Sequence, residues 1–484
     1  MLFTSFEFIV FFVILFILYW GVGKKSKSFQ NWLLLIASYV FYAFAEWRLL
    51  PLLIGATIVF YYLGIYMPKT TGKKQTALKY IGVCLGLGTL LYFKYFNFFI
   101  ESFAELFSAI GLTTNWHTFN IIMPLGVSYF TFKLISYILE IDRGKIEPCT
   151  DLVSFAIYVG FFPTIMAGPI DRPDKFIPQL FEKRIFTFDK GFDGMQQILW
   201  GLFKKAMIAD NLSPIIDGVW NNLGDASGST ILLSLILYTF QMYADFSGYS
   251  DMAIGISKLL GIRIAKNFNY PFFATNIAEF WKRWHISLTG WLTDYVFIPL
   301  NIKFRDLGNV GMILAIIINM VLVGMWHGAN WTYAVFGLYQ GLLFIPLILQ
   351  GNMNKKQKLV LNSFGLPKLL DIGKMLGIMI LYTIGVILFR AENLAQSWDV
   401  IAGMCDASLF TLPNILSKHL QFVIIIIALM MICEWFCQKK DYVLQPTEIN
   451  WKHIVGWISC DYVLIVLMIF KGNFGANQFI YFQF

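Results

Sequence analysis

Long runs of apolar residues, separated by short polar segments, dominate the pattern along this chain. About 20 consecutive apolar residues make one spanning helix, and in lipid each span must satisfy its own backbone hydrogen bonds. The first run covers 3–22. The other predicted spans are 31–50, 51–67, 78–100, 119–140, 194–220, 230–257, 309–326, 331–349, 374–390, 420–437 and 454–470. The pattern therefore predicts an all-α polytopic integral membrane protein rather than a barrel.

Two stretches depart from this pattern. Lysine and arginine in short loops mark the cytoplasmic side, and a span at 152–168 would place the basic segment 172–190 outside. We therefore expect 152–168 to be re-entrant and buried by protein. Segment 271–305 is too charged to span and is expected to lie along or dip into the cytoplasmic face. The total is roughly 11–13 transmembrane or re-entrant helices, with both termini extracytoplasmic and 391–418 as the largest external loop.

Composition supports a membrane protein and excludes several other classes. Of the 484 residues, 58% are apolar and only 14% are charged, whereas soluble domains carry about a quarter charged residues. Positive cytoplasmic loops account for the net charge of +8, so no nucleic-acid partner is needed. The six cysteines are scattered without metal-ligand spacing, so no metal site is expected. We see no internal repeat and no second domain, and predict one membrane domain over 1–484.

His327 lies in MWHGANW, between two apolar runs of about 18 residues each. An ionisable side chain at such a place is costly, by a few kcal/mol at mid-bilayer, so a functional role is the default hypothesis. Imidazole titrates near neutrality and can accept or give a proton. The structural alternative is a hydrogen-bonded histidine at a helix end, beside interfacial tryptophans.

His285 lies in EFWKRWHISLTGWLTDYVFIPL, residues 279–300. Three tryptophans, two cations and this histidine within a dozen residues suggest an interfacial amphipathic helix, which is the structural interpretation. The predicted topology favours another one. His285 enters from the cytoplasmic side and His327 from the outer side, as in a tunnel that joins a cytosolic donor to an external acceptor.

Two further segments carry unusual polar or aromatic residues. Asp245 and Asp251 lie within a predicted span, where unpaired carboxylates are expensive. We expect them to pair with Lys or Arg, with the lining of a polar tunnel as the alternative. The tail 472–484 ends in FIYFQF, and an exposed aromatic strip is an adhesion liability. The tail is expected to dock into a groove of its own protein or to bind a partner.

Seven segments in this order resemble the membrane-bound O-acyltransferase (MBOAT) superfamily, specifically its bacterial alginate-O-acetylation-like branch. They are MPLGVSYFTFKLISYILEIDRGK (123–145), FFPTIMAGPIDRP (161–173), GLFKKAMIADNL (201–212), YTFQMYADFSGYSDMAIG (238–255), NFNYPFFATNIAEFWKRWHISLTGWLTDYVFIPL (267–300), MWHGANWTYAVFGLYQG (325–341) and FIYFQF (479–484). A lone WHG is weak, whereas seven segments in order are specific.

The resemblance implies a ring of tilted helices in which a cytoplasmic tunnel and an outer funnel meet near His327. It implies that His327 is essential and that His285 is a second functional position. It also implies that acyl groups on a cytosolic thioester pass to a hydroxyl on the far side. In the related D-alanyl system a small partner ends in a similar aromatic motif whose tyrosine is proposed to relay the acyl group. Tyr481 is the corresponding relay candidate, with simple docking as the alternative.

Ester formation from a thioester needs a base for the attacking hydroxyl and a donor for the oxyanion. We assign His327 as the base. His285 is the preferred oxyanion donor or positioning group, with Trp284 Nε1–H and Arg283 as other candidates. Trp281 and Trp284 are expected to shape the tunnel. Arg283, Trp326 and Asn330 are the other residues predicted to line the tunnel or contact the substrate.

The predicted function is acetyl transfer from acetyl-CoA or another acyl thioester, with no bound cofactor, towards O-acetylation of an extracellular or cell-envelope polysaccharide. The expected partners are the lipid bilayer, the polysaccharide and an esterase-like extracytoplasmic acetyltransferase. The expected location is a bacterial cytoplasmic (inner) membrane. D-alanylation of teichoic acid and O-acetylation of peptidoglycan are the alternatives within the class. A transporter or a scaffold is the alternative outside it. The transporter is disfavoured because inverted repeats and paired interrupted helices are not evident.

Overall fold

A computed structural model describes residues 1–23, 26–112, 116, 118–353, 355, 361–446, 451–474 and 479–480, without the side chains of 451–454. Regular backbone in these residues is helical, apart from a single bridge between Leu361 and Pro367. The chain groups into two compact units, 1–195 with 253–265 and 196–252 with 266–484. The all-α prediction is confirmed, and the single membrane domain stays a prediction.

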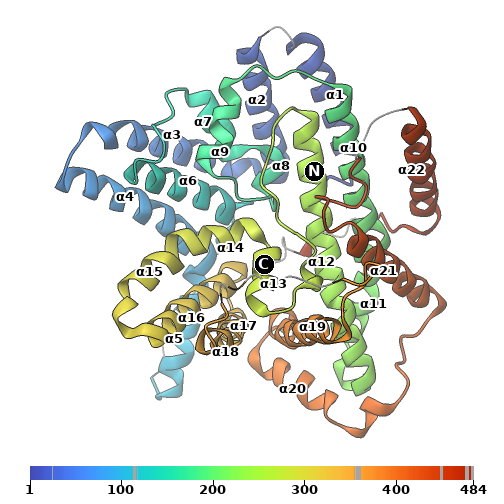
Figure 1. Cartoon of the computed structure of the whole chain (residues 1–484). Coiled ribbons are helices and arrows are strands. Elements are labelled where there is room, and N and C mark those ends of the chain that lie inside the picture. Colours follow the sequence, from blue (N-terminus) through green and yellow to red (C-terminus); the bar gives the residue numbers. More distant parts are fainter. Residues whose placement is uncertain are drawn as a thin grey trace. The chain divides into compact units, whose positions relative to one another are not determined.

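The first unit follows most of the predicted spans, but the helical stretch predicted at 78–100 extends over Lys73–Ala109, and the one predicted at 119–140 begins only at Val127 (Figure 1). Its helices are α1 (Phe6–Ile17), α2 (Lys27–Glu46), α3 (Leu50–Tyr66), α4 (Lys73–Leu90), α5 (Phe96–Ala109), α6 (Val127–Asp142), α7 (Leu152–Gly160), α8 (Phe162–Ile165) and α9 (Pro173–Phe181). The predicted break near Pro51 is confirmed, because Pro51 lies in the first turn of α3. Proline is tolerated there because first-turn amides have no intrahelical acceptor.

The predicted re-entrant stretch is two short helices. Helix α7 has nine residues, about 13.5 Å of rise, whereas a bilayer core is about 30 Å thick. Residues 154–170 are buried. Lys133 of α6 lies against this stretch, and its ammonium donates to the carbonyl of Tyr158 and, at 2.8 Å, to Thr164 Oγ1. A buried cation thus supports the break between α7 and α8, as a re-entrant segment requires.

The second unit contains the remaining helices, although part of the residues of two of them are assigned to the first unit. They are α10 (Phe188–Phe203), α11 (Asp210–Trp220), α12 (Gly228–Leu259), α13 (Ile277–Arg283), α14 (Ile286–Leu292), α15 (Ile298–Lys303), α16 (Gly308–His327), α17 (Trp331–Leu342), α18 (Ile345–Leu349), α19 (Leu369–Arg390), α20 (Leu394–Met404), α21 (Lys418–Phe436) and α22 (Trp451–Lys471). The described residues contain four π-helical segments, Leu18–Val22, Leu91–Tyr95, Lys204–Ala209 and Thr293–Phe297, of which Lys204–Ala209 joins α10 to α11. Such segments are rare in proteins, and those that do occur are often found at functional sites.

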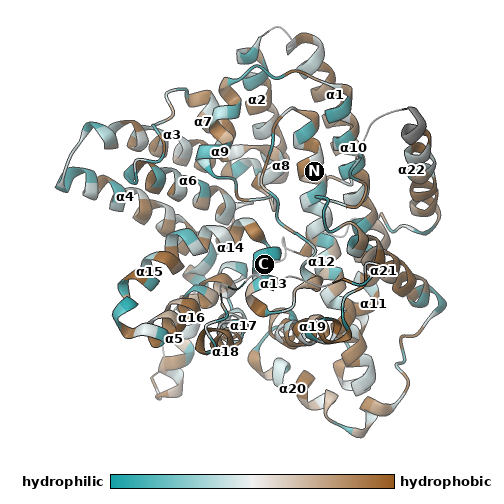
Figure 2. Ribbon diagram, in the orientation of Figure 1, coloured by the Kyte–Doolittle hydropathy of each residue, from teal (hydrophilic) through white to brown (hydrophobic). Residues whose placement is uncertain are grey.

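Six helical stretches in the described residues are long and apolar enough to cross a membrane. They are Lys27–Lys69, Lys73–Ala109, Arg305–His327, Trp331–Leu349, Leu369–Arg390 and Lys418–Phe436. Hydrophobic residues run along α19, for example, and along α22 in Figure 2. The chain is therefore a multi-pass membrane protein, whereas the total of roughly 11–13 spanning or re-entrant helices stays a prediction.

Candidate active site

The two predicted histidines lie together in the second unit. Their ring centroids are 6.3 Å apart, and the Trp326 ring contacts both, at 5.4 Å from His285 and 5.1 Å from His327. The side chains of both histidines are buried, with 1% of His285 and 4% of His327 exposed. The two imidazoles and the indole of Trp326 therefore form one buried group.

His327 is the last residue of α16, where the chain turns sharply into α17. A Cβ on Gly328 would lie 2.2 Å from the Tyr333 ring, so a larger residue does not fit the turn. The Phe389 ring of α19 packs edge-on against the imidazole of His327, with centroids 5.0 Å apart. The imidazole is therefore held between a tight turn and an aromatic ring.

Asn330, predicted to line the tunnel, has a structural position in this turn. Its Oδ1 accepts the N–H of Thr332 at 3.0 Å and so caps α17. Its Nδ2 donates to the carbonyl oxygen of Glu392 at 2.7 Å. These bonds join the His327 turn to the start of segment 391–418, and Asn330 thereby helps to fix where His327 points.

His285 lies in a break between α13 and α14, with a left-handed backbone at φ 43°. This conformation is uncommon for a residue with a side chain and persists only where the surroundings enforce it. Asn267 does so. Its carbonyl accepts the N–H of Ile286 at 2.8 Å, and its Oδ1 accepts the hydroxyl of Ser287 at 2.6 Å. The interpretation of 279–300 as one interfacial helix is therefore wrong, because the helix breaks and its central residues are buried.

The surroundings of His285 keep its imidazole neutral. Burial lowers the pKa of His285 to about 3, because the charged imidazolium loses its water. The Phe246 ring of α12 packs edge-on against it at 4.7 Å. A neutral imidazole has one N–H donor and one acceptor nitrogen. His285 can therefore donate a hydrogen bond to a developing oxyanion without changing its charge.

Trp281 and Arg283, predicted to line the tunnel, bond to other groups. Trp281 Nε1 donates to Gln340 Oε1 at 3.3 Å, which joins α13 to α17. The Arg283 guanidinium forms an ion pair with Glu279 at 2.6 Å, one turn earlier in α13. Arg283 is therefore committed to a carboxylate within its own helix.

Trp284 lies in an aromatic cluster with Phe280 and Tyr382, at centroid distances of 5.6 and 5.1 Å. Among the contacts of the described residues, Trp326 is the tryptophan that touches both histidine rings. Trp326 is thus better placed than Trp284 or Arg283 to act beside them. Nothing in the local sequence distinguishes these tryptophans, and only the packing does so.

The predicted pairing of the two buried aspartates is confirmed, and both partners come from the π-helical segment. Lys204 Nζ lies 2.6 Å from Asp251 Oδ2, and Lys205 Nζ lies 2.7 Å from Asp245 Oδ1. Lys205 also pairs with Asp210 at 2.9 Å. All these side chains are largely buried, and ion pairing offsets the cost of removing carboxylates from water.

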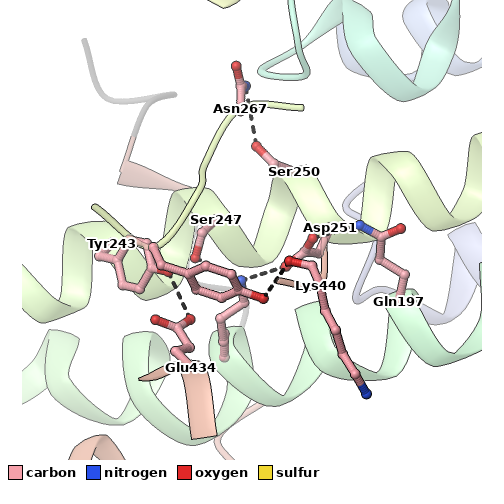
Figure 3. A network of polar contacts seen from close by, with 10 residues as sticks. Gln197, Tyr243, Ser247, Ser250, Asp251, Asn267, Glu434 and Lys440 are labelled. Carbon is pink, nitrogen blue, oxygen red and sulfur yellow. Dashed lines mark hydrogen bonds and ion pairs between the residues drawn. The ribbon is translucent and has the colours of Figure 1, made fainter. Parts of the chain in front are cut away.

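Figure 3 shows the polar network around Asp251. Gln197 Nε2 donates to Asp251 Oδ1 at 2.8 Å, and the Tyr243 hydroxyl donates to Glu434 of α21 at 2.8 Å. Ser250 accepts from Asn267 Nδ2, the residue that clamps the His285 turn. Helix α12 therefore carries a polar scaffold that extends to the turn of His285.

The C-terminal motif begins within the same unit. Phe479 and Ile480 are buried, and the N–H of Ile480 donates to Asp245 Oδ2 at 2.7 Å. The predicted docking of this segment into its own protein is thus found for its first two residues. Tyr481 lies outside the described residues.

Known proteins match most of this chain. The family model of the membrane-bound O-acyltransferase family (MBOAT) matches residues 149–385. The chain is 36% identical over 422 residues to a probable alginate O-acetylase AlgI of Azotobacter vinelandii, covering 86% of this chain and 80% of that protein. It is 37% identical over 412 residues to the protein of that name in Pseudomonas aeruginosa, covering 84% and 75%. It is 28% identical over 509 residues to a peptidoglycan O-acetyltransferase of Helicobacter pylori, covering 95% and 92%.

Proposed function

Because this chain belongs to the membrane-bound O-acyltransferase family and is an O-acyltransferase, we propose that it transfers acetyl groups from a cytosolic thioester towards an extracytoplasmic polysaccharide. The observation that carries the proposal is the buried group of His285, Trp326 and His327. Two relatives that are 36% and 37% identical to this chain over the aligned residues are named probable alginate O-acetylases, which supports an alginate-like polymer as the acceptor.

The chemistry assigns a role to each histidine. His327 takes the proton from the attacking hydroxyl as its oxygen bonds to the thioester carbonyl. His285 donates its N–H to the oxyanion that develops on that carbonyl. When the carbon–sulfur bond breaks, His327 returns the proton to the leaving thiolate. The products are an oxygen ester and the free thiol, acetyl-CoA being the proposed donor.

We assign the Tyr481 hydroxyl as the first acceptor in this scheme. The acetyl ester on Tyr481 then passes to an esterase-like extracytoplasmic acetyltransferase, which modifies the polymer. Docking of the neighbouring Phe479 and Ile480 beside α12 supports a role for this segment in the same unit as the histidines. The alternative is a segment that docks without carrying acetyl. The proposed location is a bacterial inner membrane, with both termini outside.

The test uses purified full-length protein in detergent with acetyl-CoA labelled in the acetyl group. We expect coenzyme A release in the wild type and a loss of about 10²–10⁴-fold in His327→Ala, the usual effect of removing a general base. We expect label on the peptide that contains Tyr481 in the wild type and no label there in Tyr481→Phe. Release that does not depend on His327 would overturn the assignment of the base.

The same assay separates the relay from simple docking. Release of coenzyme A that depends on His327, without label on the peptide of Tyr481, would keep the transferase and remove the relay. Label from activated D-alanine instead of acetyl-CoA would favour transfer to teichoic acid, and acetylated muropeptides would favour peptidoglycan. A scaffold predicts that His327→Ala leaves polymer acetylation unchanged. A transporter predicts substrate uptake without acyl transfer, indifferent to His327.

A further inference from the structure

The end of α22 is fastened to the π-helical segment Lys204–Ala209. The N–H of Asn473 donates to the carbonyl of Ala206 at 3.0 Å, and Asn473 Nδ2 donates to the carbonyl of Asp210 at 2.9 Å. Asn211 Nδ2 donates in return to the carbonyl of Lys471 at 3.0 Å. A π-helix shifts the hydrogen-bond register from i+4 to i+5, which opens carbonyls to outside donors. The segment thus offers polar atoms to the residues that follow α22.

A second attachment lies six residues later, at Phe479 and Ile480. Lys205 Nζ stands 4.3 Å from the centroid of the Phe479 ring, within the range of a cation–π contact. The Tyr249 ring meets Phe479 edge-on at 4.6 Å. The N–H of Ile480 donates to Asp245 Oδ2 at 2.7 Å. One cation, one ring and one carboxylate therefore hold two consecutive residues.

Charge balance explains why the site accepts a backbone N–H. Lys205 serves two carboxylates, Asp245 at 2.7 Å and Asp210 at 2.9 Å. At most 4% of each of these three side chains is exposed. One cation between two buried carboxylates leaves Asp245 Oδ2 in need of another donor. A peptide N–H supplies a charge-assisted hydrogen bond without bringing in a further charge.

The attachment and the histidine pair share one turn of α12. Asp245 and Tyr249 are four residues apart and lie on one helix face, towards Phe479 and Ile480. Phe246, the residue after Asp245, packs against His285 at 4.7 Å. A rigid helical turn therefore connects the docked dipeptide to the proposed oxyanion donor.

We infer that Lys205, Asp245 and Tyr249 form a receptor site for the chain's own residues Phe479 and Ile480. The site recognises an aromatic ring at 479 by charge and edge contact, and it recognises residue 480 through its backbone. Under the proposed function, the purpose of this docking is to retain the segment whose next residue in the sequence, Tyr481, is the acyl acceptor. Only this last purpose rests on the proposed function, and the docking itself does not.

The recognition mode predicts which substitutions the segment tolerates. Phe479→Ala removes both ring contacts, whereas Phe479→Trp keeps an aromatic face for Lys205. Ile480→Val keeps the N–H and an aliphatic side chain. Asp245→Ala removes the acceptor. Asp251→Asn is a matched control, because it disturbs the other buried Lys–Asp pair of the π-helical segment and α12, at Lys204 rather than at the receptor.

The experiment is hydrogen–deuterium exchange of full-length protein in detergent, followed by mass spectrometry with fragmentation that resolves the amide of Ile480. We expect slow exchange in the wild type, in Phe479→Trp, in Ile480→Val and in Asp251→Asn. Exchange should be at least about tenfold faster in Phe479→Ala and Asp245→Ala, because the local opening of the segment becomes easier. Unchanged melting temperatures would show that the two fast variants remain folded.

Two results would overturn the receptor: fast exchange in the wild type, or slow exchange in both Phe479→Ala and Asp245→Ala. His327→Ala distinguishes this inference from the proposed function, since it should abolish coenzyme A release and leave exchange of the segment slow. Normal coenzyme A release, together with exchange of the segment that does not change in Asp245→Ala, would contradict the receptor and leave the proposed function in place. Slow exchange of the segment without any coenzyme A release would contradict the proposed function and leave the receptor in place.

Discussion

At the scale of single residues, His285 depends on a partner that is remote in sequence. Its left-handed backbone is held by Asn267, whose carbonyl and side-chain oxygens accept from Ile286 and Ser287. Asn267 is itself buried and donates to Ser250 of α12. The sequence motif around His285 identifies this histidine as a candidate site residue. Its orientation, however, is set by Asn267, eighteen residues earlier in the chain. Asn267 was not predicted, because a lone asparagine in a loop is ordinary.

The lowered pKa of His285 gives a pH prediction. Burial disfavours the imidazolium, so the side chain stays neutral above about pH 3. We expect His285→Leu, which has no side-chain donor, to lower kcat by roughly 10²–10³-fold, as loss of an oxyanion donor does. The shape of the rate profile from about pH 5 to pH 9 should not change, because no ionisation is removed in that range. Coenzyme A release measured across this range checks it.

An acid limb present in the wild type and absent in His285→Leu would contradict this prediction. It would mean that His285 titrates during turnover. The His327→Ala variant is no control here, because its residual rate is too low for a profile. Trp326→Phe is a better comparison, since it keeps an aromatic ring beside both histidines and contains no titratable group.

At the scale of elements, close packing of α16 on α17 places His327. A Cβ on Gly324 would lie 2.1 Å from the carbonyl oxygen of Tyr333, and one on Gly337 would lie 2.3 Å from that of Met320. Small residues let two membrane helices approach closely, and such contacts drive helix association in lipid. His327 ends α16 three residues after Gly324. The close packing of α16 on α17 therefore fixes how far the His327 side chain lies from the residues of α17.

Gly324→Ala tests this packing. The added methyl group collides with backbone that cannot move aside, and overpacking of this kind costs about 1–3 kcal/mol. We expect a lower melting temperature in detergent, measured by scanning fluorimetry, together with reduced coenzyme A release. Gly377→Ala in α19 is the matched control, because a Cβ there meets nothing within 4 Å. Equal melting temperatures for the two variants would show that α16 and α17 tolerate separation.

At the scale of the whole molecule, the orientation in the membrane follows from the basic loops. The rule predicts that 391–418 is external and that the loop containing Lys73 and Lys74 is cytoplasmic. Helix α20 occupies part of the segment predicted to be external, and Cys405 at its end is exposed. Lys74 is exposed in the first turn of α4. These two positions are therefore predicted to lie on opposite sides of the membrane.

Cysteine labelling in intact cells checks this orientation. In a variant whose only cysteine is Cys405, we expect reaction with a membrane-impermeant maleimide without permeabilisation. A second variant, cysteine-free except for Lys74→Cys, should react only after permeabilisation. The reverse result would invert the topology and with it the proposed direction of acyl transfer.

The sequence by itself determined the class of protein, most of the helices and the two histidines. Apolar run length is a local property, so α2, α3, α16, α17, α19 and α21 fall near their predicted ranges. Buried carboxylates in a span demand cations, so pairing of Asp245 and Asp251 was predictable, although their partners were not. The ring of helices with a tunnel and a funnel, implied by the resemblance, stays a prediction.

Only the tertiary structure decided which side chains accompany the histidines. It selected Trp326 over Trp284 and Arg283, and it gave Asn330 the role of a helix cap. It also assigned Lys205 and Asp245 to the segment that begins at Phe479. Each of these choices depends on contacts between residues or helices brought together by packing. A one-dimensional pattern states what a side chain requires, whereas packing determines which neighbour meets the requirement.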